Sequence, residues 1–468
     1  MAVPSRADFF KNTPLDIVFE SEQGSSITCS LAHNIGNNLN AGNPLVFQLP
    51  HVDQHCINFN NSYLTFKLRI VNPDGTQIND NPRQVYPTNG IGHTIWKNIE
   101  LLANGVPTTN SYQPYAYKKM IEHLLTADSA SENYSHMWGF KKRVNVEGRN
   151  DPNDHPISML DRDTQRGQPH FVEDNPDLRD WHEFVITPAL DLFTCDTYIV
   201  SLPTVKWELR LTPHEPKHAL NWSCNWGNNL QQPAEAGVAA SLQPDFRIEI
   251  DASTVKYFMR TEKLTASAYN AAMETAKNEG GFVYSYTPSV IKTETLNQND
   301  LVKEVSNFSP RANPVLYAHT FVPHDAWSGS KRYNPYNFAP PPSLYKFYNF
   351  LNGQTIKEEM PIDFRNNGGK AQLYRNNLDS LGIDEQSKGL LYKYNEADKG
   401  FWFKVVSLTP SSETLRVAPK TSAGIHSYRL ELDQQRDRAY EVLTYIRYED
   451  AKIRINLDGT VTNSFHAQ

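Results

Sequence analysis

The feature that most constrains this chain is the alternation of apolar and polar side chains along several short stretches. In YLTFKLRI, apolar residues at 64, 66, 68 and 70 alternate with threonine, lysine and arginine. VKWELRL, from Val205, has the same pattern, and shorter examples begin at Phe246, Val255, Tyr428 and Glu441. Successive strand side chains point to opposite faces. The pattern therefore predicts antiparallel sheets with one face on a core.

Two Asn-Gly dipeptides, Asn104-Gly105 and Asn352-Gly353, each follow a predicted strand and lie 248 positions apart. This dipeptide favours a type I′ hairpin, in which both central residues take positive φ. A short helical pattern follows each turn, with apolar residues at 117, 120, 121 and 124 and again at 374, 378 and 381. The sequence thus predicts the same strand, turn and helix in two domains.

The clearest helix lies between these two units, in the alanine-rich stretch TEKLTASAYNAAMETAKNEGG. Thr265 is a predicted N-cap and Gly280 a predicted C-terminal stop. Because 468 residues exceed the roughly 250 to 300 at which one core stops growing, two domains are expected. We therefore predict an N-terminal domain over 1–262, a connecting helix over 263–281 and a C-terminal domain over 282–468.

Charge and cysteine content narrow the class of protein. The net charge is −7, from 52 acidic and 45 basic residues, and no block of like charges offers a nucleic-acid arm. Cys29, Cys56, Cys195 and Cys224 lack CxxC spacing, and the first residues lack the apolar core of a signal peptide. No apolar run is long enough to span a bilayer. We expect reduced thiols and no membrane span.

Long polar stretches separate some predicted strands, at 148–180 and at 214–244. Loops of this length are unusual inside a compact domain unless they are functional or packed against something. Many strands joined by long connections fit a jelly roll better than a meander. Trp222 and Trp226, in the second stretch, are candidate subunit-interface residues because large aromatic side chains are enriched at interfaces.

Catalytic and metal-binding motifs were weighed against ordinary structural roles. His51, Asp53, His55 and Cys56 are all possible transition-metal ligands, but strand geometry beyond them would send their side chains to different faces. In DWHEFVI, a zincin motif would need a second histidine at position 186, which is isoleucine. We predict no metal, no cofactor and no catalytic residues.

A sugar-binding or sugar-cleaving protein is the alternative from another class. A two-domain β-sandwich could bring distant carboxylates to the roughly 5 to 9.5 Å separation that glycoside hydrolysis uses. Asp161 and Asp163 are candidates, although they lie in a polar loop. A cleft with two close carboxylates would favour this alternative.

Eight longer motifs occur in a fixed order along the chain. In the first half they are DFFKNTPLDIVF, IELLANGVPTTNSYQPYAYKKMIEHLL, ITPALDLFTCDTYIVSLPTVKWELRL and VKYFMRTEKLTASAYNAAMETA. In the second half they are RYNPYNF, NFLNGQTIKEEMPIDF, GFWFKVVSLTP and YEVLTYIRYEDAKIRINLDGTV. In this order they resemble the major capsid proteins of polinton (Maverick) elements and adintoviruses. The likeness spans nearly the whole chain, and the stretches 148–180 and 384–399 fit it least.

The resemblance implies an all-β fold, a double jelly roll of two eight-stranded antiparallel barrels with a few short helices. It implies a structural protein and not an enzyme. Homotrimers of pseudo-hexagonal outline would tile an icosahedral capsid around double-stranded DNA, in contact with each other and with penton and minor capsid proteins. The virion would be assembled inside a host cell. The turn residues Asn104, Gly105, Asn352 and Gly353 would be scaffold.

Overall fold

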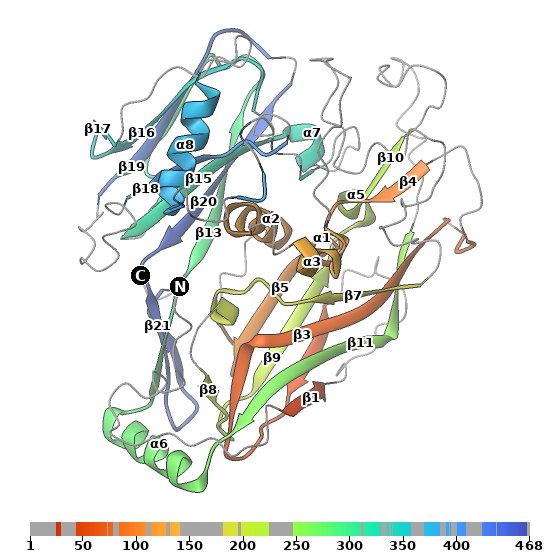
Figure 1. Ribbon diagram of the computed structural model, residues 1–468, viewed down its shortest axis with the longest axis vertical. Coiled ribbons are helices and arrows are strands. Elements are labelled where there is room, and N and C mark those ends of the chain that lie inside the picture. The colour runs from red at the N-terminus through yellow and green to blue at the C-terminus, as the bar shows by residue number, and fades with distance from the viewer. Residues whose placement is uncertain are drawn as a thin grey trace.

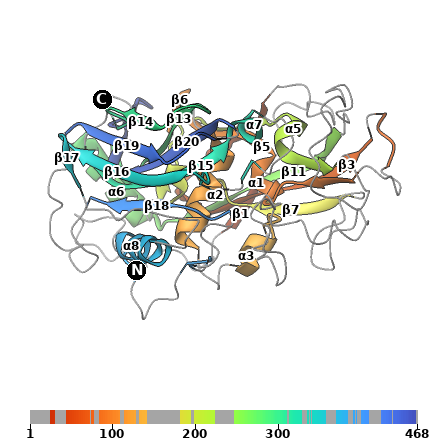
Figure 2. The ribbon, with the colours of Figure 1, turned by 90° about the horizontal axis from the view of Figure 1, so that it is seen from above.

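The computed structural model describes most of the chain, and its strands form two barrels that lie side by side (Figure 1, Figure 2). The described residues are 25–29, 44–72, 74–77, 84–108, 114–127, 132–140, 181–194, 198–223, 247–309, 313–328, 335–336, 338, 340–356, 369–383, 390–392, 394, 400–408, 424–436 and 438–465. The predicted loop 148–180, with Asp161 and Asp163, lies outside them, as do Cys195, Cys224 and Trp226.

The N-terminal barrel consists of two four-stranded antiparallel sheets, one with strand order β1-β11-β3-β7 and the other with order β2-β9-β5-β6. The short strand β8 also pairs with β3. The strands are β1 (Ser25–Cys29), β2 (Leu45–Leu49), β3 (His55–Val71), β5 (Trp96–Ala103), β6 (Val106–Pro107), β7 (His182–Ile186), β8 (Ile199–Val200), β9 (Trp207–Pro213) and β11 (Arg247–Lys263).

The C-terminal barrel repeats this topology, with sheets β13-β20-β15-β18 and β14-β19-β16-β17. Numbered in chain order within each barrel, the eight strands form sheets 1-8-3-6 and 2-7-4-5 in both barrels. The strands are β13 (Ser289–Leu296), β14 (Val302–Val305), β15 (Pro314–Pro323), β16 (Leu344–Leu351), β17 (Gln354–Thr355), β18 (Lys404–Ser407), β19 (His426–Leu432) and β20 (Tyr440–Tyr448). This is the predicted double jelly roll.

Smaller elements surround the barrels. Strands β4 (Gln84–Pro87) and β10 (Leu220–Ser223) pair with each other, and β12 (Phe282–Tyr286), β21 (Ala451–Ile455) and β22 (Val461–Asn463) form a third group. The helices are α1 (Ile91–Thr94), α2 (Tyr115–Thr126), α3 (Glu132–His136), the 3-10 helix η4 (Asp191–Thr194), α5 (Pro216–Ala219), α6 (Ala266–Glu279), α7 (His324–Trp327) and α8 (Lys370–Leu381).

Helix α6 follows the N-terminal barrel directly and has the predicted caps. The Thr265 side chain accepts a hydrogen bond from the Ala268 amide, which satisfies one of the free donors of the first turn. Gly280 ends the helix with φ 75°, a left-handed conformation that glycine adopts without strain. In Figure 1, α6 lies at the foot of the strands β12 and β21.

Three sequence expectations differ from the structure. The strands predicted from Phe246 and Val255 are one strand, β11, whose register shifts between Asp251 and Lys256 and so hides its continuity. The strand predicted from Leu64 begins at His55. The polar stretch 214–244 contains α5 and β10, whose apolar residues Ala219 and Leu220 are buried.

The core explains why the alternating stretches form strands. In β9 and β19 every second residue is buried, as an amphipathic strand requires. Strands β15 and β20 are instead buried along almost their whole length. Tyr445 of β20 contacts α2, and Glu441 pairs with His324 of α7. The outer face of this sheet is thus covered as well, and α2 lies between the two barrels (Figure 1).

Candidate functional site: the junction between the barrels

Helix α2 is the element that joins the two barrels. Its apolar residues Met120, Ile121 and Leu124 recur at helical spacing and are fully buried. The helix begins after Pro114, which has no backbone donor to lose, and ends before Ala127, which is extended. Nine of its twelve residues are buried, so the helix is covered on more than one face.

An aromatic cluster forms one part of this junction. The ring of Tyr117 on α2 lies 4.8 Å from that of Trp327 and 4.9 Å from that of Tyr336, both from the C-terminal half. Phe338 completes the cluster at 6.4 Å. Aromatic pairs at these centroid distances contribute about 0.5 to 1.5 kcal/mol beyond the area they bury. The cluster therefore holds the first half against the second.

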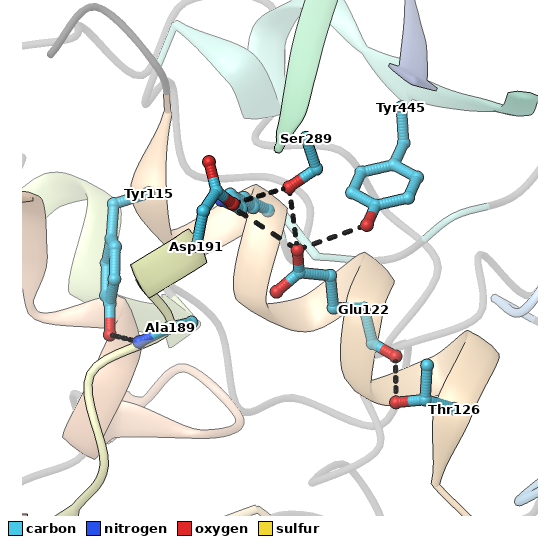
Figure 3. Close-up of polar contacts among 8 residues, drawn as sticks. Tyr115, Glu122, Thr126, Ala189, Asp191, Ser289 and Tyr445 are labelled. Atoms are coloured by element: carbon cyan, nitrogen blue, oxygen red, sulfur yellow. Dashed lines mark hydrogen bonds and ion pairs between the residues drawn. The ribbon is translucent and has the colours of Figure 1, made fainter. Parts of the chain in front are cut away.

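A buried polar cluster forms the other part (Figure 3). Lys118 of α2 pairs with Asp191 of η4, and its Nζ lies 3.9 Å from Oε1 of Glu122, one helical turn on. Ser289 of β13 places its hydroxyl oxygen 3.0 Å from Asp191 Oδ1 and 3.1 Å from Glu122 Oε1. The Tyr445 hydroxyl donates to Glu122 at 3.2 Å. Side chains of both barrels thus meet at two carboxylates.

Burial changes the ionisation of these groups. Burial raises the pKa of Glu122, and the charge of Asp191 adds to this effect, whereas Lys118 opposes it. Burial alone would lower the pKa of Lys118, but Asp191 and Glu122 outweigh it and the pKa is raised. The cluster is therefore an ammonium in contact with one carboxylate, beside a second carboxyl group whose pKa is raised.

This arrangement does not suit sugar hydrolysis. The side chains of Lys118 and Asp191 are 6% and 5% exposed, and the lysine neutralises the carboxylate it touches. A glycosidase needs two carboxyl groups facing a cleft that holds a sugar ring. The cluster can instead fix the relative position of the barrels, because breaking a buried pair leaves an uncompensated charge and costs about 3 to 5 kcal/mol.

The turn Asn104-Gly105 provides another contact between the halves. The Asn104 side chain donates to the carbonyls of Thr204, at 2.9 Å, and of Gly459, at 2.7 Å. Gly459 lies between β21 and β22, near the end of the chain. Nearby, Asn463 of β22 donates to the Thr108 carbonyl at 3.3 Å. The first Asn-Gly hairpin thus touches the C-terminal strands.

Both Asn-Gly turns have positive φ at their two central residues. The values are 48° and 79° for Asn104 and Gly105, and 50° and 79° for Asn352 and Gly353. In each hairpin the flanking residues pair directly, Ala103 with Val106 and Leu351 with Gln354, which leaves a two-residue loop. This is the geometry that the dipeptide favours in a type I′ hairpin.

The candidate metal ligands take separate partners. His51 Nδ1 lies 3.0 Å from the Ser201 hydroxyl, and His55 Nδ1 lies 2.7 Å from the backbone carbonyl of Asp53. Cys56 is fully buried, and burial raises the pKa of its thiol. Among the described residues, no three His, Cys, Asp or Glu side chains are grouped in a way that could hold a metal ion.

Sequence reasoning missed one pattern. His214-Glu215-Pro216-Lys217-His218 matches the H-E-x-x-H spacing of zinc peptidases. In that motif both histidines lie on one helix, whereas α5 begins only at Pro216 and leaves His214 outside it. The two imidazole rings are 4.5 Å apart. Two histidines alone do not make the three-ligand site that zinc catalysis uses.

The predicted interface tryptophans are placed only in part. Trp222 lies in β10, where its backbone is opposite Val85 of β4. Trp226 lies outside the described residues. The interface role of the pair stays a prediction.

The junction residues themselves were not predicted. Lys118 and Glu122 look like an ordinary i, i+4 pair on a helix surface, and such pairs are usually solvated. Ser289 and Tyr445 are distant in sequence from them, so no local pattern links the four. The one signal in the sequence is that apolar residues surround both charges in YAYKKMIEHLL, which leaves α2 little polar surface.

No known protein family and no characterised protein sequence matches this chain. Solved structures do. A chain of the Sputnik virophage is similar with a TM-score of 0.55 and 11% identity over 97% of this chain and 90% of that chain. The major capsid protein of mavirus has a TM-score of 0.50 and 12% identity, over 99% of this chain and 95% of that one.

The protein VP54 of PBCV-1 is similar over 97% of this chain and 98% of its own length, with a TM-score of 0.51 and 10% identity. At such low identity these likenesses concern the fold alone. Within this chain, the strand order of the two barrels is the same in both halves. The chain is an all-β protein with a double jelly-roll fold.

Proposed function

We propose that this chain is a major capsid protein that forms homotrimeric capsomers of pseudo-hexagonal outline. One observation carries the proposal, namely that a single chain holds two barrels of identical strand order, fixed side by side by a buried junction. Three copies about an axis present six similar barrels, so sixfold neighbours can be met by a closed threefold assembly. The likeness of its fold to the major capsid protein of mavirus supports this role.

The finer identity follows from the sequence resemblance. We propose a polinton (Maverick) or adintovirus-type protein whose capsomers tile an icosahedral shell around double-stranded DNA, without sequence-specific DNA contacts. Penton and minor capsid proteins would be its other partners, and assembly would take place in the host cell. Within the part of the chain that the structure describes, no helix combines the length and apolar character needed to cross a bilayer.

We also propose a domain boundary at α6, with 1–262 and 282–468 as the two jelly-roll domains. Limited proteolysis tests this division. Cleavage should concentrate near α6, and each fragment should remain protected. Rapid cleavage within β3 or β20 under the same conditions would contradict it.

The oligomeric state tests the capsomer. Light scattering should report about 160 kDa, three times the 53.3 kDa chain. Obligate interfaces commonly bury upwards of about 2,000 Å², so the trimer should persist on dilution. Negative-stain images should show particles of hexagonal outline. An intact monomer across the micromolar range would overturn the proposal.

The candidate interface residues can be tested in the same assay. Replacing both Trp222 and Trp226 with alanine should weaken the trimer, because large aromatic side chains dominate interface energies. Trp181→Ala is the matched control, since Trp181 is 37% exposed and stacks under Arg69 of the same chain. Equal trimer stability in all three proteins would remove the tryptophans from the interface.

A further inference from the structure

The polar cluster at the junction contains an amine and two carboxyl groups, which are chemical groups that can react with one another. One ammonium, Lys118, lies beside two carboxyl groups, Asp191 and Glu122. Figure 3 shows the two carboxyl groups where Ser289 and Tyr445 of the other barrel meet them. Lys118 Nζ is in direct contact with Asp191 Oδ1, and both side chains are nearly inaccessible to water. An amine held against a carboxyl group in a dry site is a reactant pair as well as an ion pair.

The Ser289 hydroxyl lies between the carboxyl groups of Glu122 and Asp191, where it can pass a proton from one to the other. Ser289 has one hydroxyl proton, yet its oxygen lies within 3.1 Å of both Glu122 Oε1 and Asp191 Oδ1. If both carboxyl groups were ionised, Ser289 could donate to only one of them. When Glu122 is ionised, Ser289 donates to it. When Glu122 is protonated, its O–H can instead donate to Ser289, which then donates to Asp191. Both contacts of the Ser289 hydroxyl are then satisfied, and the raised pKa of Glu122, caused mainly by burial, agrees with this.

We propose that Lys118 and Asp191 form an intramolecular isopeptide bond, with Glu122 as the group that transfers protons. Glu122 gives its proton through Ser289 to Asp191, whose carbonyl carbon becomes electrophilic. Lys118 gives a proton to the Glu122 carboxylate, 3.9 Å away, and becomes a neutral amine. The amine attacks Cγ of Asp191, the C–N bond forms, one C–O bond breaks and water leaves.

The balance of this reaction needs no external reagent. An ammonium and a carboxylate become a secondary amide and one water molecule, and Glu122 ends in its starting state. Preorganisation increases the rate of the reaction, because reactants held in contact behave as if at very high effective concentration. Release of the water molecule to the solvent then favours the amide. Burial would lower the pKa of Lys118, but Asp191, with a smaller contribution from Glu122, outweighs burial and the pKa is raised. The neutral amine is therefore scarce, so the reaction is slow.

The position of Ser289 makes the bond depend on the docking of the barrels. Lys118 and Asp191 both belong to the N-terminal half, on α2 and η4, but Ser289 is the first residue of β13 in the C-terminal barrel. The proton relay is complete only when the second barrel is in place. The bond would then fix α2 to η4 permanently and constrain the unfolded chain between them, as a disulfide does.

Mass spectrometry of the denatured full-length chain tests the proposal. The wild-type protein should be lighter than its sequence by one water molecule, and a protease digest should contain a branched peptide that joins Lys118 to Asp191. Lys118→Arg keeps the positive charge but cannot form this amide. The measured mass of this variant should therefore equal the mass calculated from its sequence. Lys119→Arg, one residue along the same helix, should still lose the water.

Two further variants separate the chemistry from structure. Glu122→Gln retains the shape of the side chain but cannot shuttle a proton, and Ser289→Ala removes the relay from the other barrel. Both should show loss of the cross-linked fraction while remaining folded. A folded wild-type protein that keeps its full sequence mass after prolonged incubation would overturn the proposal, whether or not the variants fold. The test is independent of trimer formation, so it can fail while the capsid proposal stands.

Discussion

The hairpins β5–β6 and β16–β17 occupy the same position in the two barrels, and their turns have nearly equal backbone angles. Their surroundings differ. Asn104 accepts a hydrogen bond from the amide of Lys206, just before β9, and donates to the carbonyl of Gly459 near the end of the chain. Asn352 accepts a hydrogen bond from the amide of Ile425, just before β19, which is the equivalent of the contact to Lys206. Among the described residues, the same local structure therefore contacts the other half of the chain only in the first hairpin.

The helices that follow these hairpins, α2 and α8, differ in how much of their surface is buried. Nine of the twelve residues of α2 are buried, but only Leu373 and Asn377 of the twelve in α8 are. Asn377 donates to the Phe403 carbonyl and accepts from the Val405 amide, so α8 covers the edge of strand β18. In Figure 2, α8 lies on the outer side of its barrel. The local sequence therefore determines that a helix forms after each hairpin. Contact with the neighbouring barrel determines how much of that helix is buried.

The largest expected effect concerns the glycines that lie against the two turns. A Cβ on Gly459 would lie 2.5 Å from the Thr204 carbonyl oxygen, at φ 89°, so Gly459→Ala should destabilise the protein by about 2 to 5 kcal/mol. A Cβ on Gly424 would meet only side-chain ends of Asn352 and Leu351, so Gly424→Ala should cost less. Denaturant unfolding measures both, and equal losses of stability would show that the contact to Gly459 adds nothing.

Substitution within the turns should affect the two halves equally. A Cβ at Gly105 or Gly353 would have no atom within 4 Å, so the cost of valine comes from the positive φ alone. Gly105→Val and Gly353→Val should each cost about 1 to 3 kcal/mol. Gly105→Asn and Gly353→Asn are the controls, because asparagine tolerates this conformation. A melting temperature unchanged by valine would contradict the positive φ at that site.

Acid should distinguish the first hairpin–helix unit from the second. His123 of α2 packs edge-on against Phe140 and Trp138, and burial, reinforced by Lys119, lowers its pKa to about 3. Helix α8 contains no histidine. In the unfolded chain His123 binds a proton near pH 6.5, whereas in the folded state its pKa is about 3. The free energy of unfolding therefore decreases as the pH falls below 6.5.

At pH 5.5 this loss should be about 1.4 kcal/mol. His123→Gln should remove that part of the pH dependence, after correction for the cost of the substitution at pH 7. Urea unfolding at the two pH values measures it. If wild type and variant lose the same stability between pH 7 and 5.5, His123 does not titrate as its burial implies.

The fold was predictable because its signals are local. Alternation defines the strands, Asn104-Gly105 and Asn352-Gly353 place the hairpins, and Thr265 and Gly280 bound α6. Continuity of β11 was missed because an irregular register at Asp251 interrupts its pattern. Such irregularities are set by pairing with the neighbouring strand, β3, which one sequence window does not contain.

The junction was not predictable in the same way. Whether Lys118 and Glu122 face water or a second barrel depends on residues about 170 to 320 positions away, in β13 and β20. Charged side chains are seldom fully buried, so a prediction from sequence alone places Lys118 and Glu122 on the surface. Their burial follows from docking of the barrels, a tertiary event that local propensity does not record.

The smallest and most specific effect concerns the asparagine side chains of the turns. Glycine at either position keeps the positive φ and removes only the side chain. Asn104→Gly removes hydrogen bonds to Thr204, Lys206 and Gly459, whereas Asn352→Gly removes the one to Ile425. Exposed hydrogen bonds are worth about 0.5 kcal/mol each, the low end of the usual range, so Asn104→Gly should be the less stable variant by about 1 kcal/mol.

Proteolysis of the two variants makes this difference diagnostic. If the Asn104 side chain joins the halves, its removal should also increase cleavage between β21 and β22, where Gly459 lies, because that turn is then without its partner from the other barrel. Asn352→Gly should leave the cleavage rate there unchanged. Equal rates in both variants would mean that the C-terminal strands are held by Asn463 and the buried junction, and that the two turns differ in position but not in function.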